Sequence, residues 1–205
     1  MVERGNDFYI SIKRIETLVD GIFAIALTLM VLNLHLPDPS GIWTNSMVWN
    51  VLWGQTNNFF VYALTFFILI SFWVSHHRGF DQLKRADKGL FWLNAVWLFF
   101  VALTPFSTSL AGDFSSNVPA ALFFNTNMFL LGMFSFLIRR HVIEHELSDK
   151  PLGKDEIKKI YANWLTFPVM AFLGIILSLV IPDYSYIVYL LNVIVHRILH
   201  KIIGT

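Results

Sequence analysis

An acid inside the first long apolar stretch is the most chemically suggestive residue of this chain. Asp20 lies six residues after Arg14, so the two side chains leave a helix on different faces. A carboxylate within a membrane costs roughly 2.5 kcal/mol or more unless polar groups partner it. We therefore expect Asp20 and Arg14 each to find polar partners on other helices.

The same stretch carries two stripes of residues at helical spacing. Large apolar side chains form one stripe: Leu18, Ile22, Ile25, Leu29 and Leu32. Small side chains form its neighbour, which lets another helix approach closely: Thr17, Gly21, Ala24 and Thr28. Ordinary helix packing explains both stripes. The alternative is that several copies of this helix form rings of Ile and Leu, which make narrow, dewetting constrictions in channels.

Histidine pairs suggest pH sensing or metal binding. His76 and His77 end the second apolar stretch. They either titrate near neutral pH or bond the end of that stretch to the first one, which we favour. Residues 141–145 match the H-x-x-E-H zinc motif, but no third ligand accompanies them, and a zinc hydrolase is disfavoured. For His196 and His200, a cationic helix end at the membrane surface is favoured over a metal site.

Composition identifies an integral membrane protein. Of the 205 residues, 56% are hydrophobic and 14% are charged, with a mean hydropathy of +0.59. Soluble domains carry about 25% charged residues. The absence of cysteine excludes disulfides, thiolate catalysis and cysteine-based metal sites. No long polar segment remains for a catalytic domain, so we expect no enzyme activity.

Six apolar stretches reach the length of about 20 residues that a bilayer requires. We place the spans at 15–36, 51–75, 90–111, 118–138, 160–181 and 184–203. Only Pro182 and Asp183 separate the last two, which predicts a tight hairpin. The expected fold is a single all-α transmembrane domain of six helices over residues 1–205. Asparagines within the spans are expected to bridge helices: Asn33, Asn94, Asn125, Asn127, Asn163 and Asn192.

The distribution of charge predicts the orientation. All 15 Lys and Arg residues fall on one side of the six-span arrangement, and the positive-inside rule then places both termini in the cytoplasm. The opposite loops carry Asp38, Asp113 and Asp183. Such acids at an outer mouth would concentrate cations. The simpler explanation, that short outer loops avoid basic residues, is favoured.

Three motifs in order resemble the transmembrane protein 175 family of potassium channels. Arg14 with residues 18–29 (LVDGIFAIALTL) resembles the signature first helix of that family, and residues 73–77 resemble its Trp-x-x-His-His ending. Residues 94–113 resemble its third helix. The likeness covers about the first 113 residues; the second half agrees only in hydropathy and topology.

This resemblance implies a potassium-preferring cation channel. A prokaryotic, single-repeat member would assemble as a homotetramer in the cell membrane, with the pore lined by the first helix of each subunit. The family's constriction positions map onto Ile25, Leu29 and Leu32, with the polar Thr28 beside them. No carbonyl-type selectivity filter is expected. K⁺ and other monovalent cations would permeate, with no cofactor, metal or nucleic-acid partner.

One departure from the family pattern concerns its polar network, which maps onto Arg14, Asp20, Trp73 and His77. The family reads Arg-x-x-x-Phe-Ser-Asp, whereas this chain has Leu-Val-Asp, and Val19 cannot make a serine's hydrogen bonds. We therefore expect this polar network to contain fewer hydrogen bonds than in other members of the family.

The alternative function is a proton- or ion-coupled secondary transporter that works through Asp20 and the histidines. Such transporters usually show internal repeats and broken helices, and neither is visible in this sequence.

Overall fold

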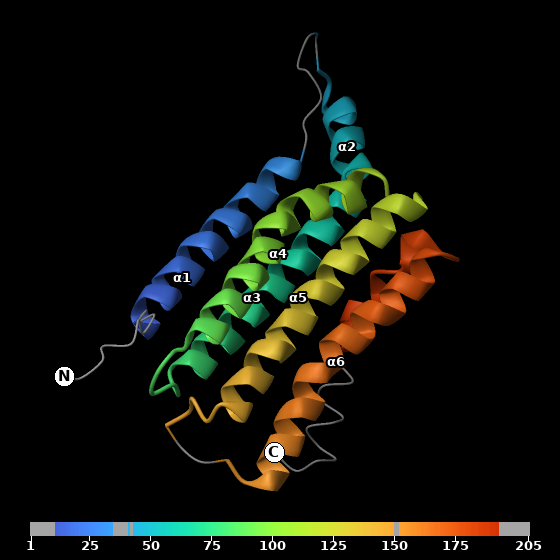
Figure 1. Cartoon of the computed structure of the whole chain (residues 1–205). Coiled ribbons are helices and arrows are strands. Elements are labelled where there is room, and N and C mark those ends of the chain that lie inside the picture. Colours follow the sequence, from blue (N-terminus) through green and yellow to red (C-terminus); the bar gives the residue numbers. More distant parts are fainter. Residues whose placement is uncertain (1–10, 35–40, 42, 150–151, 193–205) are drawn as a thin grey trace, which may run out of the picture.

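The computed structural model of the chain describes residues 11–34, 41, 43–149 and 152–192, and all of its regular elements are helical (Figure 1). The α-helices are α1 (Ile12–Leu29), α2 (Asn45–Gly54), α3 (Thr56–Phe80), α4 (Lys88–Asp113), α5 (Val118–Glu144) and α6 (Lys154–Ser178). Two short 3₁₀ segments are η1 (Met30–Asn33) and η2 (Pro182–Tyr184). Helix begins again at residue 187 and continues to residue 192, where the description ends.

Five helical segments in the described part of the chain are long and apolar enough to cross a membrane. They are Ile12–Asn33, which joins α1 to η1, and helices α3, α4, α5 and α6. Figure 1 shows them as one bundle of roughly parallel and antiparallel rods, with α1 along one edge and α6 along the other. The all-helical membrane fold is therefore confirmed. Most of the sixth expected span, 184–203, lies outside the described residues.

The second span differs most from its predicted limits of 51–75. The structure breaks this apolar stretch at Gln55, so that α2 is a separate short helix and the span itself is Thr56–Phe80. No residue of α2 is buried. The predicted limits take in residues 51–54 at the end of α2, because hydropathy measures apolarity and does not detect where a helix breaks. The helix break falls where Gly54, a poor helix former, meets Gln55.

The limits of the other spans also differ from the predicted ones. The span predicted at 160–181 is α6, Lys154–Ser178, because charged residues extend the helix beyond the apolar stretch. Glu156 holds this helix start by accepting a hydrogen bond of 2.8 Å from the backbone N–H of Gly153. The predicted tight hairpin is wrong: residues 179–186, including η2, connect α6 to the following helix. The first span is shifted to Ile12–Asn33, and α5 begins at the predicted Val118 but continues to Glu144.

Asparagine side chains join the helices, as predicted, at four of the six positions. Asn127 on α5 donates to Thr104 and Ser107 of α4 at 3.2 and 3.1 Å. Asn125 donates to Ser178 and Ser185, at 2.9 and 3.0 Å. The other two, Asn94 and Asn33, are described with the site. Among the described residues, the buried Oδ1 atoms of Asn163 and Asn192 lack a hydrogen-bond partner.

Close packing between α5 and α6 depends on a small residue. A Cβ atom added at Gly132 would lie 2.7 Å from a ring carbon of Phe167 and 3.2 Å from the backbone nitrogen of Pro168. Glycine therefore lets the two helices approach each other closely.

The end of the bundle that carries Lys84, Arg85 and Lys154 is called the basic end. The two loops at this end pair with each other through backbone hydrogen bonds. The backbone N–H of Lys84 donates to the carbonyl of Leu147 at 3.0 Å, and the N–H of Asp149 donates to that of Gln82 at 2.8 Å. These bonds form an isolated antiparallel bridge between the α3–α4 and α5–α6 connections. The start of α1 and the start of α6 lie at the same end (Figure 1).

Candidate pore face and polar network

Helix α1 has two unlike faces. Ile15, Val19, Phe23, Ala26 and Met30 are buried against the rest of the bundle. The Phe23 ring lies 5.4 Å from that of Trp97 on α4. This face accounts for the packing of α1 within the chain, so the opposite face is left for other contacts.

The opposite face carries the predicted constriction residues. The side chains of Ile25, Leu29 and Leu32 are 60%, 45% and 66% exposed. Ile22, assigned to the same stripe by spacing, is instead half-buried and packs against the core. The helix changes to 3₁₀ geometry after Leu29, so Leu32 does not continue the α-helical stripe. Asn33 anchors this 3₁₀ turn by donating to the carbonyl of Pro105 on α4 at 2.8 Å.

The small-residue stripe is open as well. Thr17, Gly21, Ala24 and Thr28 are exposed, and a Cβ added at Gly21 would meet nothing within 4 Å. Thr28 donates its hydroxyl proton to the carbonyls of Ala24 and Ile25, both at 2.9 Å. Because the hydroxyl only donates in these two contacts, its oxygen keeps its capacity to accept.

The acid of α1 is bonded to α3. Trp73 donates its indole N–H to Oδ1 of Asp20 at 2.8 Å. The Trp73 ring also stacks on His77, with centroids 5.9 Å apart and planes 17° apart. Arg14 is exposed, and no ion pair joins it to Asp20 in the described structure. Val19, where the family has serine, packs in the core instead.

His76 has partners other than those predicted. It shares a hydrogen bond of 2.7 Å with Oδ1 of Asn94 on α4, and its ring stacks on Trp97 with centroids 5.0 Å apart. The expected bond to the first span is therefore wrong for His76. The helical turn rotates His76 towards α4 and leaves the neighbouring His77 beside α1.

Comparison with known proteins finds a family match in the first half of the chain. Residues 14–105 match the family described as the endosomal/lysosomal potassium channel TMEM175. We refer to residues 14–105 as the TMEM175 segment because of this match. The family resemblance of the sequence is thereby confirmed. The TMEM175 segment contains nearly all of α1, all of α2 and α3, and most of α4, so it includes both the exposed α1 face and the Asp20–Trp73 bond.

Relatives of the TMEM175 segment carry channel names. The chain is 32% identical over 115 residues to a potassium channel of Streptomyces collinus, a match that takes in 54% of each protein. The chain thus matches about half the length of this relative. It is 25% identical over 138 residues to the endosomal/lysosomal proton channel TMEM175 of Danio rerio, over 64% of this chain and 26% of that protein.

A solved structure supports the fold over the whole chain. The crystal structure of a lysosomal potassium-selective channel TMEM175 homolog from Chamaesiphon minutus aligns with a TM-score of 0.74 and 23% identity. The alignment covers 95% of this chain and 98% of that one. The part of the second half that this alignment covers therefore shares the fold, although its sequence shows none of the family's motifs.

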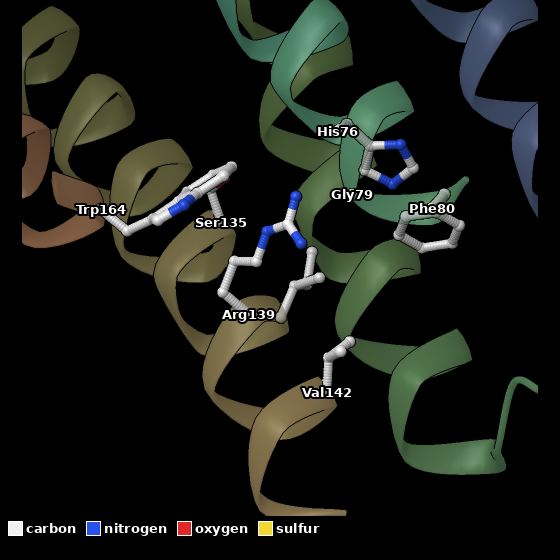
Figure 2. A pocket seen from close by; sticks show the side chains of 8 residues that line it. His76, Gly79, Phe80, Ser135, Arg139, Val142 and Trp164 are labelled. Carbon is white, nitrogen blue, oxygen red and sulfur yellow. The ribbon is translucent and has the colours of Figure 1, made fainter. Parts of the chain in front are cut away.

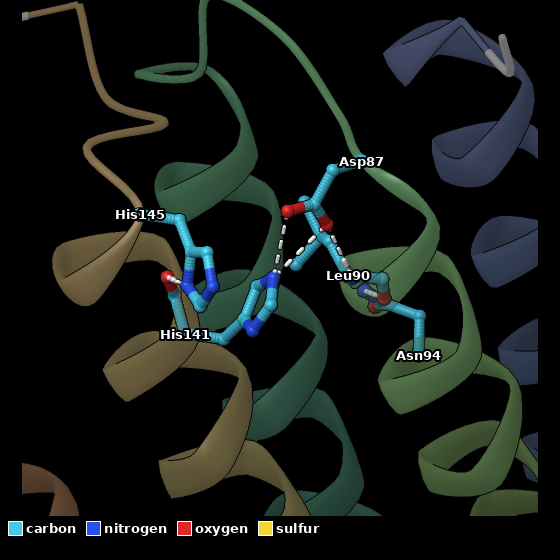
Figure 3. Close-up of polar contacts among 5 residues, drawn as sticks. All are labelled: Asp87, Leu90, Asn94, His141 and His145. Atoms are coloured by element: carbon cyan, nitrogen blue, oxygen red, sulfur yellow. Dashed lines mark hydrogen bonds and ion pairs between the residues drawn. The ribbon is translucent and has the colours of Figure 1, made fainter. Parts of the chain in front are cut away.

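The H-x-x-E-H motif lies outside the TMEM175 segment and is accounted for by helix-end contacts (Figure 3). His141 lies 2.9 Å from both carboxylate oxygens of Asp87, which caps the start of α4 by accepting from the N–H of Leu90 at 2.7 Å. Glu144 pairs with Arg140 at 2.7 Å. Since these ligands are already engaged with protein groups, the geometry gives no support to a zinc hydrolase. His196 and His200 lie outside the described residues.

The Asp87 carboxylate sits just outside the membrane-spanning helix α4. Partial burial opposes its ionisation, but the hydrogen bonds from Leu90 and His141 outweigh this effect and lower the pKa of Asp87 below its ordinary value. The charged form is thus stabilised by the folded chain.

The predicted outer-mouth acids have structural partners. Asp113 accepts from Asn58 at 3.0 Å and from Ser109 at 3.1 Å, which links α3 to the end of α4. Asp183 accepts from Ser116 at 2.9 Å. Asp38 lies outside the described residues. The two described acids hold helix ends together whether or not they also attract cations.

Arg139 lines a pocket near the basic end, together with residues of α3, α5 and α6 (Figure 2). This guanidinium donates to the backbone carbonyl of Ser75 at 3.1 Å and lies 4.8 Å from the centre of the Trp164 ring. A Cβ at Gly79 would overlap the guanidinium, so glycine leaves the room that it occupies. Arg139 thereby connects α3, α5 and α6.

Two pairs of ionisable residues on the facing sides of α1 and α3 have only weak signals in the sequence. Glu16 and Asp20 are four residues apart on α1, and His77 and Asp81 are four apart at the end of α3. The spacing places each pair on one helix face, but it does not say that the two faces meet.

Proposed function

We propose that the chain is one subunit of a homotetrameric, potassium-preferring cation channel whose pore is lined by α1. The observation that carries this proposal is the exposed face of α1, where large apolar side chains lie beside an open stripe of small ones. The family description and the names of the relatives support cation conduction. The orientation with the basic end in the cytoplasm and the location in the cell membrane belong to the same proposal.

Four copies of α1, each with the η1 turn that follows it, would place Ile25, Leu29 and Leu32 in the ion path when arranged around an axis. Rings of branched apolar side chains narrow a pore below the size of a hydrated ion and favour drying. An ion then sheds water with little compensation, so conduction is slow. Dehydration costs less for K⁺ than for the smaller Na⁺, which gives a moderate preference without a carbonyl filter. The hydroxyl oxygen of Thr28, which is exposed, would offset part of the lost hydration.

Helix continuity favours a channel over a secondary transporter. Transporter sites usually lie where helices are interrupted near the middle of the membrane. Helices α3, α4, α5 and α6 each run without interruption, although Pro105 lies inside α4 and Pro168 inside α6.

The experiment is flux and single-channel recording on the purified protein in liposomes. Unitary currents with K⁺ exceeding Na⁺ are expected, and H⁺ flux is measured in parallel because one relative is named a proton channel. We expect Ile25→Asn and Leu29→Asn to raise flux and lower selectivity. Thr28→Val is expected to lower selectivity with less effect on flux.

A matched control is Leu173→Asn on α6, since Leu173 is 43% exposed and Leu29 is 45% exposed. It is expected to leave conduction unchanged. If the α1 variants fold yet conduct like the parent protein, α1 does not line the pore. Saturable transport without unitary steps would favour the transporter.

A further inference from the structure

The facing sides of α1 and α3 bring polar side chains together at two successive levels, called rungs below. Asp20 and Trp73 make the first, through their hydrogen bond of 2.8 Å. One turn towards the basic end, Glu16 on α1 lies beside His77 on α3, and Asp81 follows one turn later. This register arises because the two helices run in opposite directions, so that a step of four residues back along α1 matches a step of four forward along α3.

Three potential metal ligands meet at the second rung. One carboxylate oxygen of Glu16, one of Asp81 and a ring nitrogen of His77 all lie within 4.8 Å of one another. The His77 Nε2 atom is 3.9 Å from Oδ2 of Asp81. From this geometry we propose that Glu16, His77 and Asp81 form a binding site for a divalent transition metal such as Zn²⁺, which joins the basic ends of α1 and α3.

The donor set suits this class of ion. Zinc takes imidazole nitrogen and carboxylate oxygen at roughly 2.0–2.2 Å and commonly uses three protein ligands with a water at the fourth position. A tetrahedral ion at those bond lengths holds its ligands roughly 3.4 Å apart. His77 and Asp81 are exposed and Glu16 is half-buried, so small side-chain rotations close the remaining gap. An imidazole ligand disfavours Mg²⁺ and Ca²⁺, which prefer oxygen alone.

The imidazole is also restrained on one side. Its ring stacks on Trp73, and the Trp73 indole is fixed by its bond to Asp20. A fixed imidazole loses less freedom on binding a metal than a mobile one. The contrast is the H-x-x-E-H motif, which has the spacing of a zinc site but whose His141 and Glu144 are bonded to Asp87 and Arg140.

The test is isothermal titration of Zn²⁺ into the purified, metal-free full-length protein at pH 7. Every protein carries His196→Gln and His200→Gln, so that this second histidine pair does not contribute. We expect one Zn²⁺ per chain. Glu16→Gln, His77→Gln and Asp81→Asn should each weaken binding at least tenfold, because each removes one of three ligands.

The matched control is Glu144→Gln, which changes the acid of the H-x-x-E-H motif and is expected to leave Zn²⁺ affinity unchanged. Elution in size-exclusion chromatography verifies that each isosteric variant is folded. The proposal is overturned if the parent takes up no Zn²⁺, or if any of the three ligand variants binds it as tightly as the parent. Binding is measured without ion flux, so the result stands apart from the proposed channel function.

Discussion

The hydrogen bond between Trp73 and Asp20 allows a quantitative test of how α1 is held. Trp73→Phe removes the indole N–H but keeps an aromatic ring against His77, and Asp20→Ala removes the acceptor. A hydrogen bond to a charged group is worth about 1.5–3 kcal/mol. Because Asp20 is exposed within the single chain, we take the lower end and expect a coupling free energy of roughly 1.5 kcal/mol.

The assay is a double-mutant cycle on the free energy of unfolding, measured by SDS titration in mixed micelles. The control cycle combines Asp20→Ala with Trp49→Phe, since Trp49 is 60% exposed on α2. The changes in unfolding free energy at independent sites add to within about 0.5 kcal/mol. We expect the two substitutions of the control cycle to be additive within this limit. Additivity within that limit for Trp73 and Asp20 would refute the idea that this bond fastens α1 to α3. Asp20 would then be free for a role in conduction alone.

Three further expectations concern packing, pH and topology. Gly132→Ala should lower the free energy of unfolding by about 1–3 kcal/mol through overpacking against α6, whereas Gly21→Ala should not destabilise the isolated chain, because that position is open; SDS titration compares the two. The folded chain lowers the pKa of Asp87, so its stabilising contribution is present above the ordinary value of 3.8 and is lost as the pH falls through the folded pKa. The stability gap between the parent and Asp87→Asn should therefore shrink between pH 7 and pH 3, and an unchanged gap would contradict this. A reporter fused to either terminus should be active in the cytoplasm, and external activity would exclude the proposed orientation.

Hydropathy predicted most of the membrane helices because apolar length is what a bilayer selects. It misplaced the start of the second span, which was predicted at residue 51 although the helix breaks at Gln55 and the span begins at Thr56. It also misplaced the start of α6, whose first turns are charged. Both errors have the same cause, since apolar character and helical structure do not end at the same residue.

Contacts between helices were harder to predict than the helices themselves. The spacing around Ile25 and Leu29 located the exposed face of α1, because periodicity reveals the faces of a helix. The sequence does not identify which neighbour each face meets, so His76 was assigned to the first span although it bonds Asn94 on α4. The pairing of Asp87 with His141, 54 residues apart, has no local signature beyond the position of Asp87 before α4.

The paired loops at the basic end have a mechanical consequence. Helices α3, α4 and α5 are cross-braced there by the bridge at Leu83 and Ser148, by Asp87 with His141, and by Arg139 with the carbonyl of Ser75. Helix α1 has no share in these braces. A displacement of α1 would therefore leave these three connections intact and would act instead on the Trp73–Asp20 and Asn33–Pro105 hydrogen bonds.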